Sequence, residues 1–235
     1  MRYCTKGQAR LSLLSLLLLT ALALLAACGG SSSAPDAHQL IKDAQTAFQK
    51  VTSYHFNLTA ENAGAGGFVA IKGADGDTLV PDKLQANANA LVLGNVVQVK
   101  IIAIGSKQYV TDPISGKWTT ASNLLDPRTL SDSNTGVIAI LGEVQNPSTP
   151  QDSTSNGRPC WSIDGKLDAK YLAGITGGGT ATGKQVNVTL CIGKSDKLPY
   201  MVRVNGVAIS GDTDKTVRTF TLSKFNEQLS ISAPI

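Results

Sequence analysis

Three hydrophobic patterns follow one another along the first 61 residues of this chain. An almost uninterrupted apolar run extends from Leu11 to Ala27. From Asp36 to Val51 apolar residues recur at helical spacing, and Asp36 is suited to cap the N-terminus of that helix. From Tyr54 to Glu61 apolar and polar residues alternate, which predicts a half-buried antiparallel strand with His55 on its polar face.

The alternating pattern then repeats in short segments separated by turns. The predicted strands span residues 68–73, 84–93, 96–104, 107–111, 117–120, 160–166, 184–192, 200–209 and 216–225. Asp75-Gly76-Asp77 and Gly94-Asn95 have turn composition, and Leu229 to Ser232 is a candidate edge strand. Because strands that follow each other through short turns usually pair, we expect one antiparallel sheet.

A middle region breaks this alternation. Asn123 to Pro127 begins a helical region, and Val137 to Leu141 is a short apolar helix. Asn146 to Pro159 has loop composition, whereas Asp168 is placed to cap a short helix that runs to Ile175. We therefore expect an α+β domain whose helices, at the start and in the middle of the chain, lie on one face of the sheet.

The N-terminal apolar run has the features of a secretory signal. Three basic residues precede it, and Leu25-Ala26-Ala27-Cys28 ends it, followed by a Gly/Ser-rich stretch. This ending resembles the lipobox of bacterial lipoproteins, in which the cysteine becomes the first mature residue and carries diacylglycerol. The alternative is a transmembrane helix, for which the run is short. We expect a signal peptide over 1–27, a lipidated Cys28 with a flexible tether over 28–35, and a folded domain over 36–235.

Removal of the signal changes the charge balance. It takes away three basic residues and no acidic one, so the formal net charge falls from +4 to +1. No basic excess remains to indicate a nucleic-acid partner. The acylated Cys28 would instead attach the protein to the outer face of the cytoplasmic membrane, because several acyl chains on one cysteine give stable anchoring.

Two cysteines remain in the mature domain, Cys160 and Cys191. In an exported compartment this pair predicts one disulfide, which would stabilise the fold by about 3–4 kcal/mol through loop entropy. Two buried free thiols are the alternative. Only His38 and His55 could add imidazole ligands, and neither has metal-site spacing to a cysteine, so we expect no metal and no cofactor.

An ordered series of short motifs runs through the domain. It comprises Ala44-Gln45-Thr46-Ala47-Phe48-Gln49-Lys50-Val51-Thr52-Ser53-Tyr54-His55, Tyr109-Val110-Thr111, Lys117-Trp118-Thr119, Leu125-Asp126-Pro127, Asn134-Thr135-Gly136-Val137 and Phe220-Thr221-Leu222-Ser223-Lys224-Phe225. In order and spacing this series resembles the LppX/LprA/LprF/LprG family of lipoproteins over nearly all of residues 36–233. The Cys160 and Cys191 pair and the Asn146 to Pro159 segment depart from the family pattern.

The resemblance implies a curved antiparallel sheet, a half-barrel, wrapped around helices, similar to periplasmic lipoprotein carriers. Between sheet and helices it implies an apolar cavity that holds lipid acyl chains. Members carry di- or triacylated lipids or lipoglycans through the cell envelope. We expect a monomer here, with an envelope transporter as a candidate partner.

A lipid cavity needs a concave apolar surface that the protein's own side chains leave unfilled. Small side chains on the third predicted strand would leave that volume, and neighbouring elements would line it. The predicted lining residues are Phe56, Leu58, Val69, Ile71, Ala86, Ala88, Ala90, Val97, Val99, Ile101, Val137, Ile140 and Leu141. The helix Val137 to Leu141, flanked by Gly136 and Gly142, is a candidate movable wall. Ordinary core packing is the alternative for each of these residues.

Enzyme signatures are absent from the sequence. It lacks a Gly-x-Ser-x-Gly elbow, and the Gly177-Gly178-Gly179-Thr180 segment lacks the Lys-Ser/Thr context of a phosphate loop. We therefore predict a membrane-anchored, lipid-binding lipoprotein that is not an enzyme. The rival prediction is an envelope protein-interaction or sensor module with the same fold and a filled core, and an envelope hydrolase ranks below both.

Overall fold

The computed structural model describes residues 34–64, 69–92, 94–122, 128, 130, 136–172 and 183–235. Residues 35–235 form one compact unit. Its strands, as described, are β1 (Ser53–Glu61), β2 (Val69–Leu79), β3 (Lys83–Val92), β4 (Asn95–Ile104), β5 (Lys107–Thr111), β6 (Trp118–Ala121), β7 (Gln151–Ser155), β8 (Arg158–Asp168), β9 (Gln185–Gly193), β10 (Pro199–Asn205) and β11 (Val217–Ser223). The predicted signal peptide, Cys28, Asn123 to Pro127 and Gly177 to Gly179 lie outside the described residues.

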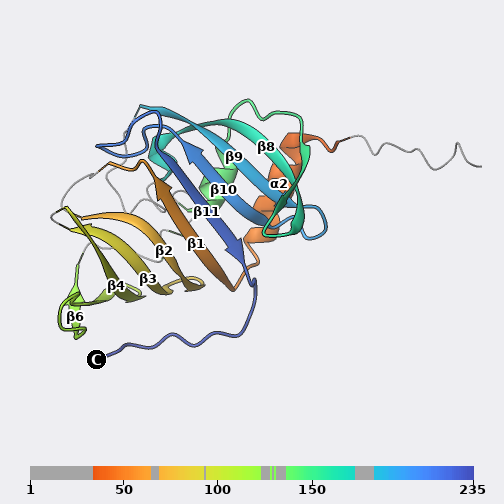
Figure 1. Cartoon of the computed structure of the whole chain (residues 1–235). Helices are drawn as coiled ribbons and strands as arrows, with labels where there is room; N and C mark the ends of the chain where they lie inside the picture. The colour runs from red at the N-terminus through yellow and green to blue at the C-terminus, as the bar shows by residue number, and fades with distance from the viewer. Residues whose placement is uncertain are drawn as a thin grey trace, which may run out of the picture. The chain divides into compact units, whose positions relative to one another are not determined.

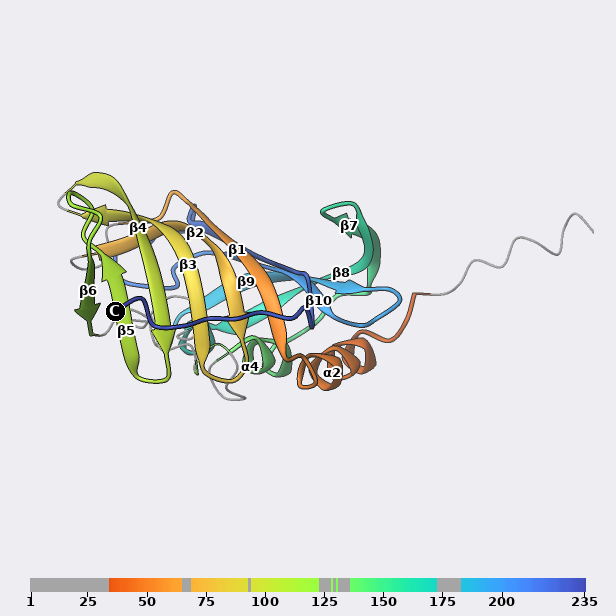
Figure 2. The same ribbon diagram turned by 90° about the horizontal axis from the view of Figure 1, so that it is seen from below.

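These strands form one open antiparallel sheet in the order β6-β5-β4-β3-β2-β1-β11-β10-β9-β8-β7. Two meanders, β1–β6 and β7–β11, meet where the first strand pairs with the last, and Phe56 lies opposite Leu222. Figure 2 shows β1–β5 curving around one side of the unit. The predicted single curved antiparallel sheet is therefore confirmed.

Two helices pack on the inner side of this sheet. In α2 (Ala37–Phe48), Asp36 caps the first turn by accepting a hydrogen bond from the Gln39 amide at 2.8 Å. The buried face of α2 contacts the short apolar helix α4 (Val137–Gly142), and Gln45 Nε2 donates to the Ile138 carbonyl at 3.1 Å. Both helices lie behind β8–β10 in Figure 1, as expected for helices on one face.

The predicted turn at Asp75-Gly76-Asp77 is wrong, because β2 continues through these residues to Leu79. A β-bulge between Ile71 and Gly73 shifts the alternation before this segment, so the pattern of Val69 and Ile71 does not continue through it. A Cβ at Gly76 would approach the Gln85 carbonyl oxygen to 2.2 Å, so the close approach of β3 accounts for this glycine.

The predicted loop from Asn146 to Pro159 contains a strand. Its residues Gln151–Ser155 form β7, which pairs with β8 at the edge of the sheet. Four of the five β7 residues are exposed, so no buried face imposes a hydrophobic alternation on the sequence. This is why composition alone indicates a loop.

The candidate edge strand from Leu229 to Ser232 is also wrong, because these residues belong to no strand. The chain instead leaves β11 through a hydrogen bond from the Asn226 amide to the Ser53 carbonyl at 2.8 Å. It then runs alongside the β1–β6 lobe to end near β6 (Figure 1 and Figure 2). Ile231 in this tail is buried, at 4% exposure.

The helix expected after Asp168 is a 3-10 turn, η2 (Ala169–Leu172), within the described residues. Asp168 Oδ1 accepts from the Lys170 amide at 2.9 Å, as a capping residue would. The remainder of the predicted helix, to Ile175, lies outside the described residues.

In the part of the chain that the structure describes, none of the helices combines the length and apolar character needed to cross a membrane.

Candidate functional site

Strand register places the predicted lining residues of β1–β4 on one face of the sheet. The same face carries the side chains that pack toward α2 and α4. Its two best-defined transverse rows are Phe56–Gly76–Ala86–Ile101 and Leu58–Ala74–Ala88–Val99. The sequence prediction of which residues share this inner face is confirmed by the register, because side chains alternate along β1, β3 and β4 and the bulge in β2 keeps Ile71 and Ala74 on the same face.

The inner face of β1–β4 has large side chains at its flanks and small ones in its centre. β1 contributes Phe56 and Leu58, and β4 contributes Val99 and Ile101. Between them, β2 and β3 present only glycine and alanine in both rows. We call this strip of small residues, formed by Ala74, Gly76, Ala86, Ala88 and Ala90, the alanine trough. The three alanines of β3 span about 13 Å of strand at the usual rise per residue.

Burial divides the predicted lining residues into two groups. The buried group comprises Phe56, Ala86, Ala88, Ala90, Val99, Ile101, Val137, Ile140 and Leu141. Leu58, Ile71 and Val97 are only partly buried where they pack against the same core cluster. The Val69 side chain lies outside the described part of the structure. Register thus establishes that the described lining residues of β1, β3 and β4 share one face of the sheet, whereas Val137, Ile140 and Leu141 lie on α4, and the role of all of them in ligand binding stays a prediction.

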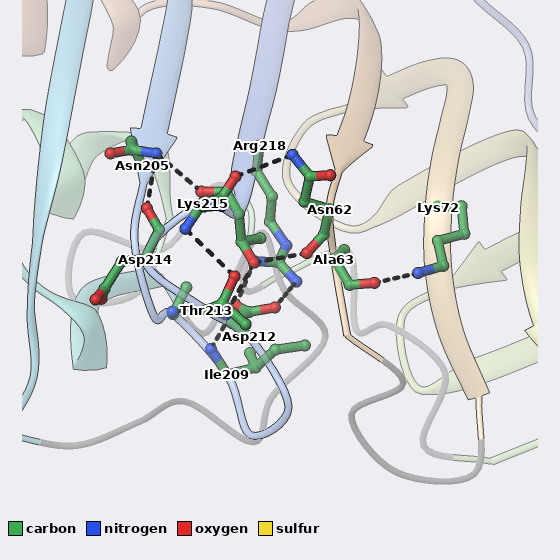
Figure 3. Close-up of polar contacts among 12 residues, drawn as sticks. Asn62, Ala63, Lys72, Asn205, Ile209, Asp212, Thr213, Asp214, Lys215 and Arg218 are labelled. Carbon is green, nitrogen blue, oxygen red and sulfur yellow. Dashed lines mark hydrogen bonds and ion pairs between the residues drawn. The ribbon is translucent and has the colours of Figure 1, made fainter.

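The inner face also carries one buried cation that sequence reasoning missed. Arg218 lies on β11, opposite Ala60 of β1 and Val204 of β10, and its side chain is only 7% exposed. Its guanidinium donates to both carboxylate oxygens of Asp212, at 2.5 and 2.8 Å (Figure 3). This bidentate pair is the strong form of an arginine–carboxylate contact.

The loop between β10 and β11 holds Asp212 in place. Its Oδ2 also accepts hydrogen bonds from the amides of Ala208 at 3.1 Å and Ile209 at 3.0 Å. Burial alone would raise the pKa of Asp212, but the hydrogen bonds from Arg218 and from these amides outweigh it and lower the pKa. Asp212 is therefore ionised at neutral pH and balances the buried guanidinium.

The same loop is tied to the end of β1. Thr216 Oγ1 donates to the Asn62 carbonyl at 2.8 Å. Asn62 Nδ2 donates to the Lys215 carbonyl at 3.2 Å (Figure 3). Lys72 also donates to the Ala63 carbonyl. A polar network thus joins β10–β11 to β1 and β2 at one end of the sheet. The residues of this network are spread between positions 62 and 218, so no local sequence motif predicts it.

Cys160 and Cys191 form a disulfide across β8 and β9, the pair expected from the sequence, with Cα atoms 5.5 Å apart. It lies in a small second cluster with Tyr200, separate from the main core. The Arg158 guanidinium covers that cluster, 3.5 Å from the centre of the Tyr200 ring. The disulfide thus links two neighbouring strands covalently within this second cluster.

The chemistry available on the inner face is burial of apolar surface. Among the described residues, no group of three or more His, Cys, Asp or Glu side chains could hold a metal ion. His55 lies on the outer face, as predicted, and is half-buried between Asp75 and Asp77. The inner face therefore offers an acyl chain or another apolar group a surface to pack against.

Comparison with known proteins places the chain in a family. The family model described as LppX_LprAFG lipoprotein matches residues 36–231. LprF of Mycobacterium bovis, named as a candidate diacylated glycolipid transporter, is 24% identical over 216 residues, covering 86% of this chain and 79% of its own. LprF of Mycobacterium tuberculosis matches to the same extent.

Two solved structures share the fold. The crystal structure of LprF from Mycobacterium bovis superposes with a TM-score of 0.68 at 22% identity, covering 87% of this chain and 99% of that one. Lipoprotein LppX of Mycobacterium tuberculosis gives a TM-score of 0.61 at 18% identity, covering 83% and 98%. With the family match over nearly the whole compact unit, these findings show that the chain belongs to the LppX_LprAFG lipoprotein family.

Proposed function

We propose that this protein is a lipid carrier of the cell envelope that binds acyl chains against the alanine trough. The observation that carries the proposal is the distribution of side-chain size on the inner face of β1–β4. Glycine and alanine in the centre carry the shortest side chains, and Phe56, Leu58, Val99 and Ile101 flank them with larger apolar ones. Each methylene buried there would contribute about 0.8 kcal/mol, so long acyl chains need few polar contacts.

The family supports this reading of the inner face. LprF carries a name that describes a diacylated glycolipid transporter, and the chain shares its fold. By that analogy the cargo is a di- or triacylated lipid or lipoglycan, and no catalytic group is required. We further propose that Cys28, acylated after signal cleavage, anchors the carrier to the outer face of the cytoplasmic membrane.

The test of lipid binding is native mass spectrometry of residues 29–235, which include the compact unit, purified from a lipid-rich bacterial host. The proposal expects co-purified lipid carrying two or three acyl chains at near-equal stoichiometry. A mass equal to that of the polypeptide, unchanged after incubation with a lipid extract, would contradict it. That result would favour the alternative of an interaction module with a filled core.

The anchor has its own test. The full chain and a Cys28→Ser variant are expressed in a bacterium, and the membrane fraction is examined by intact mass. We expect an acylated species that begins at Cys28 in the parent and loss of that species in the variant. An unmodified, membrane-free parent protein would rule out the anchor without affecting lipid binding.

A further inference from the structure

A hollow of about 300 Å³ lies on the outer face of β1–β4, on the opposite side of the sheet from the alanine trough. We call it the outer hollow. Its volume is at the lower end of the range for small-ligand sites. The outward side chains that line it are His55, Asp75, Asp77, Gln85, Asn87, Lys100, Ile102 and Trp118. The proposed carrier function uses none of them.

Strand register explains why these side chains meet. One outer row runs His55–Asp77–Gln85–Ile102 across β1–β4. The next row runs Asn57–Asp75–Asn87–Lys100. The second row continues to β6, because the Lys100 amide donates to Thr111 Oγ1 and Thr111 lies opposite Trp118. Residues from six strands, β1 to β6, thus form one mainly polar surface with the Trp118 indole at its end.

Hydrogen bonds fix the carboxylates at one side of the outer hollow. The two ring nitrogens of His55 lie 2.9 Å from Asp77 Oδ1 and 3.2 Å from Asp75 Oδ2. Gln85 Nε2 donates to Asp77 Oδ2 at 2.9 Å, and Asn57 Nδ2 donates to Asp75 Oδ2 at 3.2 Å. Burial would raise the pKa of Asp77, but the hydrogen bonds from Gln85 and His55 outweigh it and lower the pKa. Both carboxylates are therefore held in position before any ligand arrives.

Other polar groups of the outer hollow have unused hydrogen-bonding capacity. Among the described residues, the Asn87 amide, Lys100 Nζ and the Trp118 indole N–H make no hydrogen bond or ion pair. Asn87 offers both donors and an acceptor, Lys100 and Trp118 offer donors, and Asp75 Oδ1 offers an acceptor. The outer hollow thus presents donors and acceptors together beside an aromatic ring.

This mixture discriminates between classes of ligand. Two carboxylates against one lysine disfavour an anion, and polar groups dominate the outward lining, which disfavours an acyl chain. A metal ion is disfavoured because His55 occupies the space between the carboxylates. A sugar fits, because each hydroxyl both donates and accepts, while the C–H face of the ring can pack on an indole.

We propose that the outer hollow binds a short neutral saccharide, with Trp118 as the packing surface and Asp75, Asn87 and Lys100 as hydroxyl partners. Because this surface is on the other side of the sheet from the alanine trough, the site is independent of the proposed lipid binding. Loss of either activity leaves the other to be measured.

The chain offers its own reporter, because it contains two tryptophans, Trp118 and Trp161. A Trp161→Phe variant of residues 29–235 retains Trp118 as its single fluorophore. The matched Trp118→Phe variant retains only Trp161, which lies on β8 beneath Lys194. Each is titrated with maltose, cellobiose and lactose, and saturation-transfer NMR of the parent identifies the sugar protons that contact the protein.

The proposal expects a saturable change of Trp118 fluorescence with at least one disaccharide and none in the Trp118→Phe protein. Asp75→Asn and Asn87→Ala, each made in the Trp161→Phe protein, should weaken that binding at least tenfold. Absence of fluorescence change and saturation transfer in a folded Trp161→Phe protein would overturn it. A response of Trp118 to calcium chloride or inorganic phosphate alone would also overturn it, by assigning the outer hollow to an ion.

Discussion

The two halves of the sheet bury their inner faces to different degrees. On β8–β11 the inner side chains are large and almost wholly covered, with Ile163, Leu190 and Val202 at 0% exposure. On β1–β4 the central side chains are glycine and alanine, and Leu58, Ile71 and Val97 are partly exposed. Both halves therefore belong to one core cluster, but the β1–β4 half contributes smaller side chains to it and leaves three of its apolar side chains partly exposed.

The position of the helices explains part of this difference. α2 contacts β9, and α4 contacts both α2 and η2, so the helices fill the β8–β11 side. Side-chain size explains the rest, because alanine at three successive inner positions of β3 cannot fill the space that leucine or isoleucine fills on β9. The β8–β11 half therefore contributes more apolar burial to folding, and the proposed binding surface is on the β1–β4 half.

The largest expected effect concerns the buried charge of Arg218, in the β8–β11 half of the sheet. Asp212→Asn leaves the Arg218 guanidinium buried without its counter-charge, which should cost about 3–5 kcal/mol of unfolding free energy. Urea denaturation at pH 7 measures this loss. The matched control is Asp214→Asn in the same loop, an exposed position where a change below about 0.5 kcal/mol is expected. Equal losses of unfolding free energy in the two variants would show that the Arg218–Asp212 pair does not stabilise the fold.

The same pair predicts a pH dependence with a definite sign. Since the pKa of Asp212 is lower in the folded state, the unfolded chain takes up the proton first as pH falls. The stabilisation is therefore complete above an ordinary aspartate pKa of about 3.9 and declines as pH drops through the lower folded pKa. In the Asp212→Asn variant, the free energy of unfolding measured between pH 7 and pH 2 should lack this acid-sensitive component.

A smaller effect is expected when a leucine is replaced by alanine in each half of the sheet. Leu190→Ala removes a fully buried side chain and should cost about 2–5 kcal/mol, because a cavity remains in close packing. Leu58→Ala removes a partly exposed one and should cost less than about 2 kcal/mol. Chemical denaturation of the two variants compares the halves directly. Losses of the same size would show that β1–β4 is packed as tightly as β8–β11.

Alternation identified most of the sheet from the sequence because one face of each such strand is buried. Phe56 and Leu58, Ala86 and Ala88, and Val99 fall on the predicted inner face. Alternation does not predict a strand that has no buried face. β7 is exposed on both faces and therefore has no alternation.

The candidate sites show the same limit. The β3 part of the trough could be predicted, because Ala86, Ala88 and Ala90 lie at every second position of one strand. Its β2 part, Ala74 and Gly76, could not, because the sequence there has turn composition. The Arg218–Asp212 pair could not, because the loop conformation that buries Asp212 depends on backbone contacts to Asn62. The outer hollow could not be predicted, because Asp75-Gly76-Asp77 has the composition of a turn. Only the structure shows that β3 passes close to Gly76.

The smallest expected effect on stability tests the trough itself. Ala88→Trp places a large ring among small neighbours and should cost about 1 kcal/mol or less, whereas overpacking a tight core usually costs about 1–3 kcal/mol. The control is Ala44→Trp on α2, at 0% exposure, where the higher cost is expected.

If acyl chains occupy the trough, Ala88→Trp should abolish lipid retention in native mass spectrometry while the thermal midpoint stays near that of the parent. Retention of lipid by a folded Ala88→Trp protein would place the acyl chains elsewhere. Unfolding of this variant to the same degree as Ala44→Trp would show that the trough is ordinary core, and the distinction between the two halves would then rest on side-chain size alone.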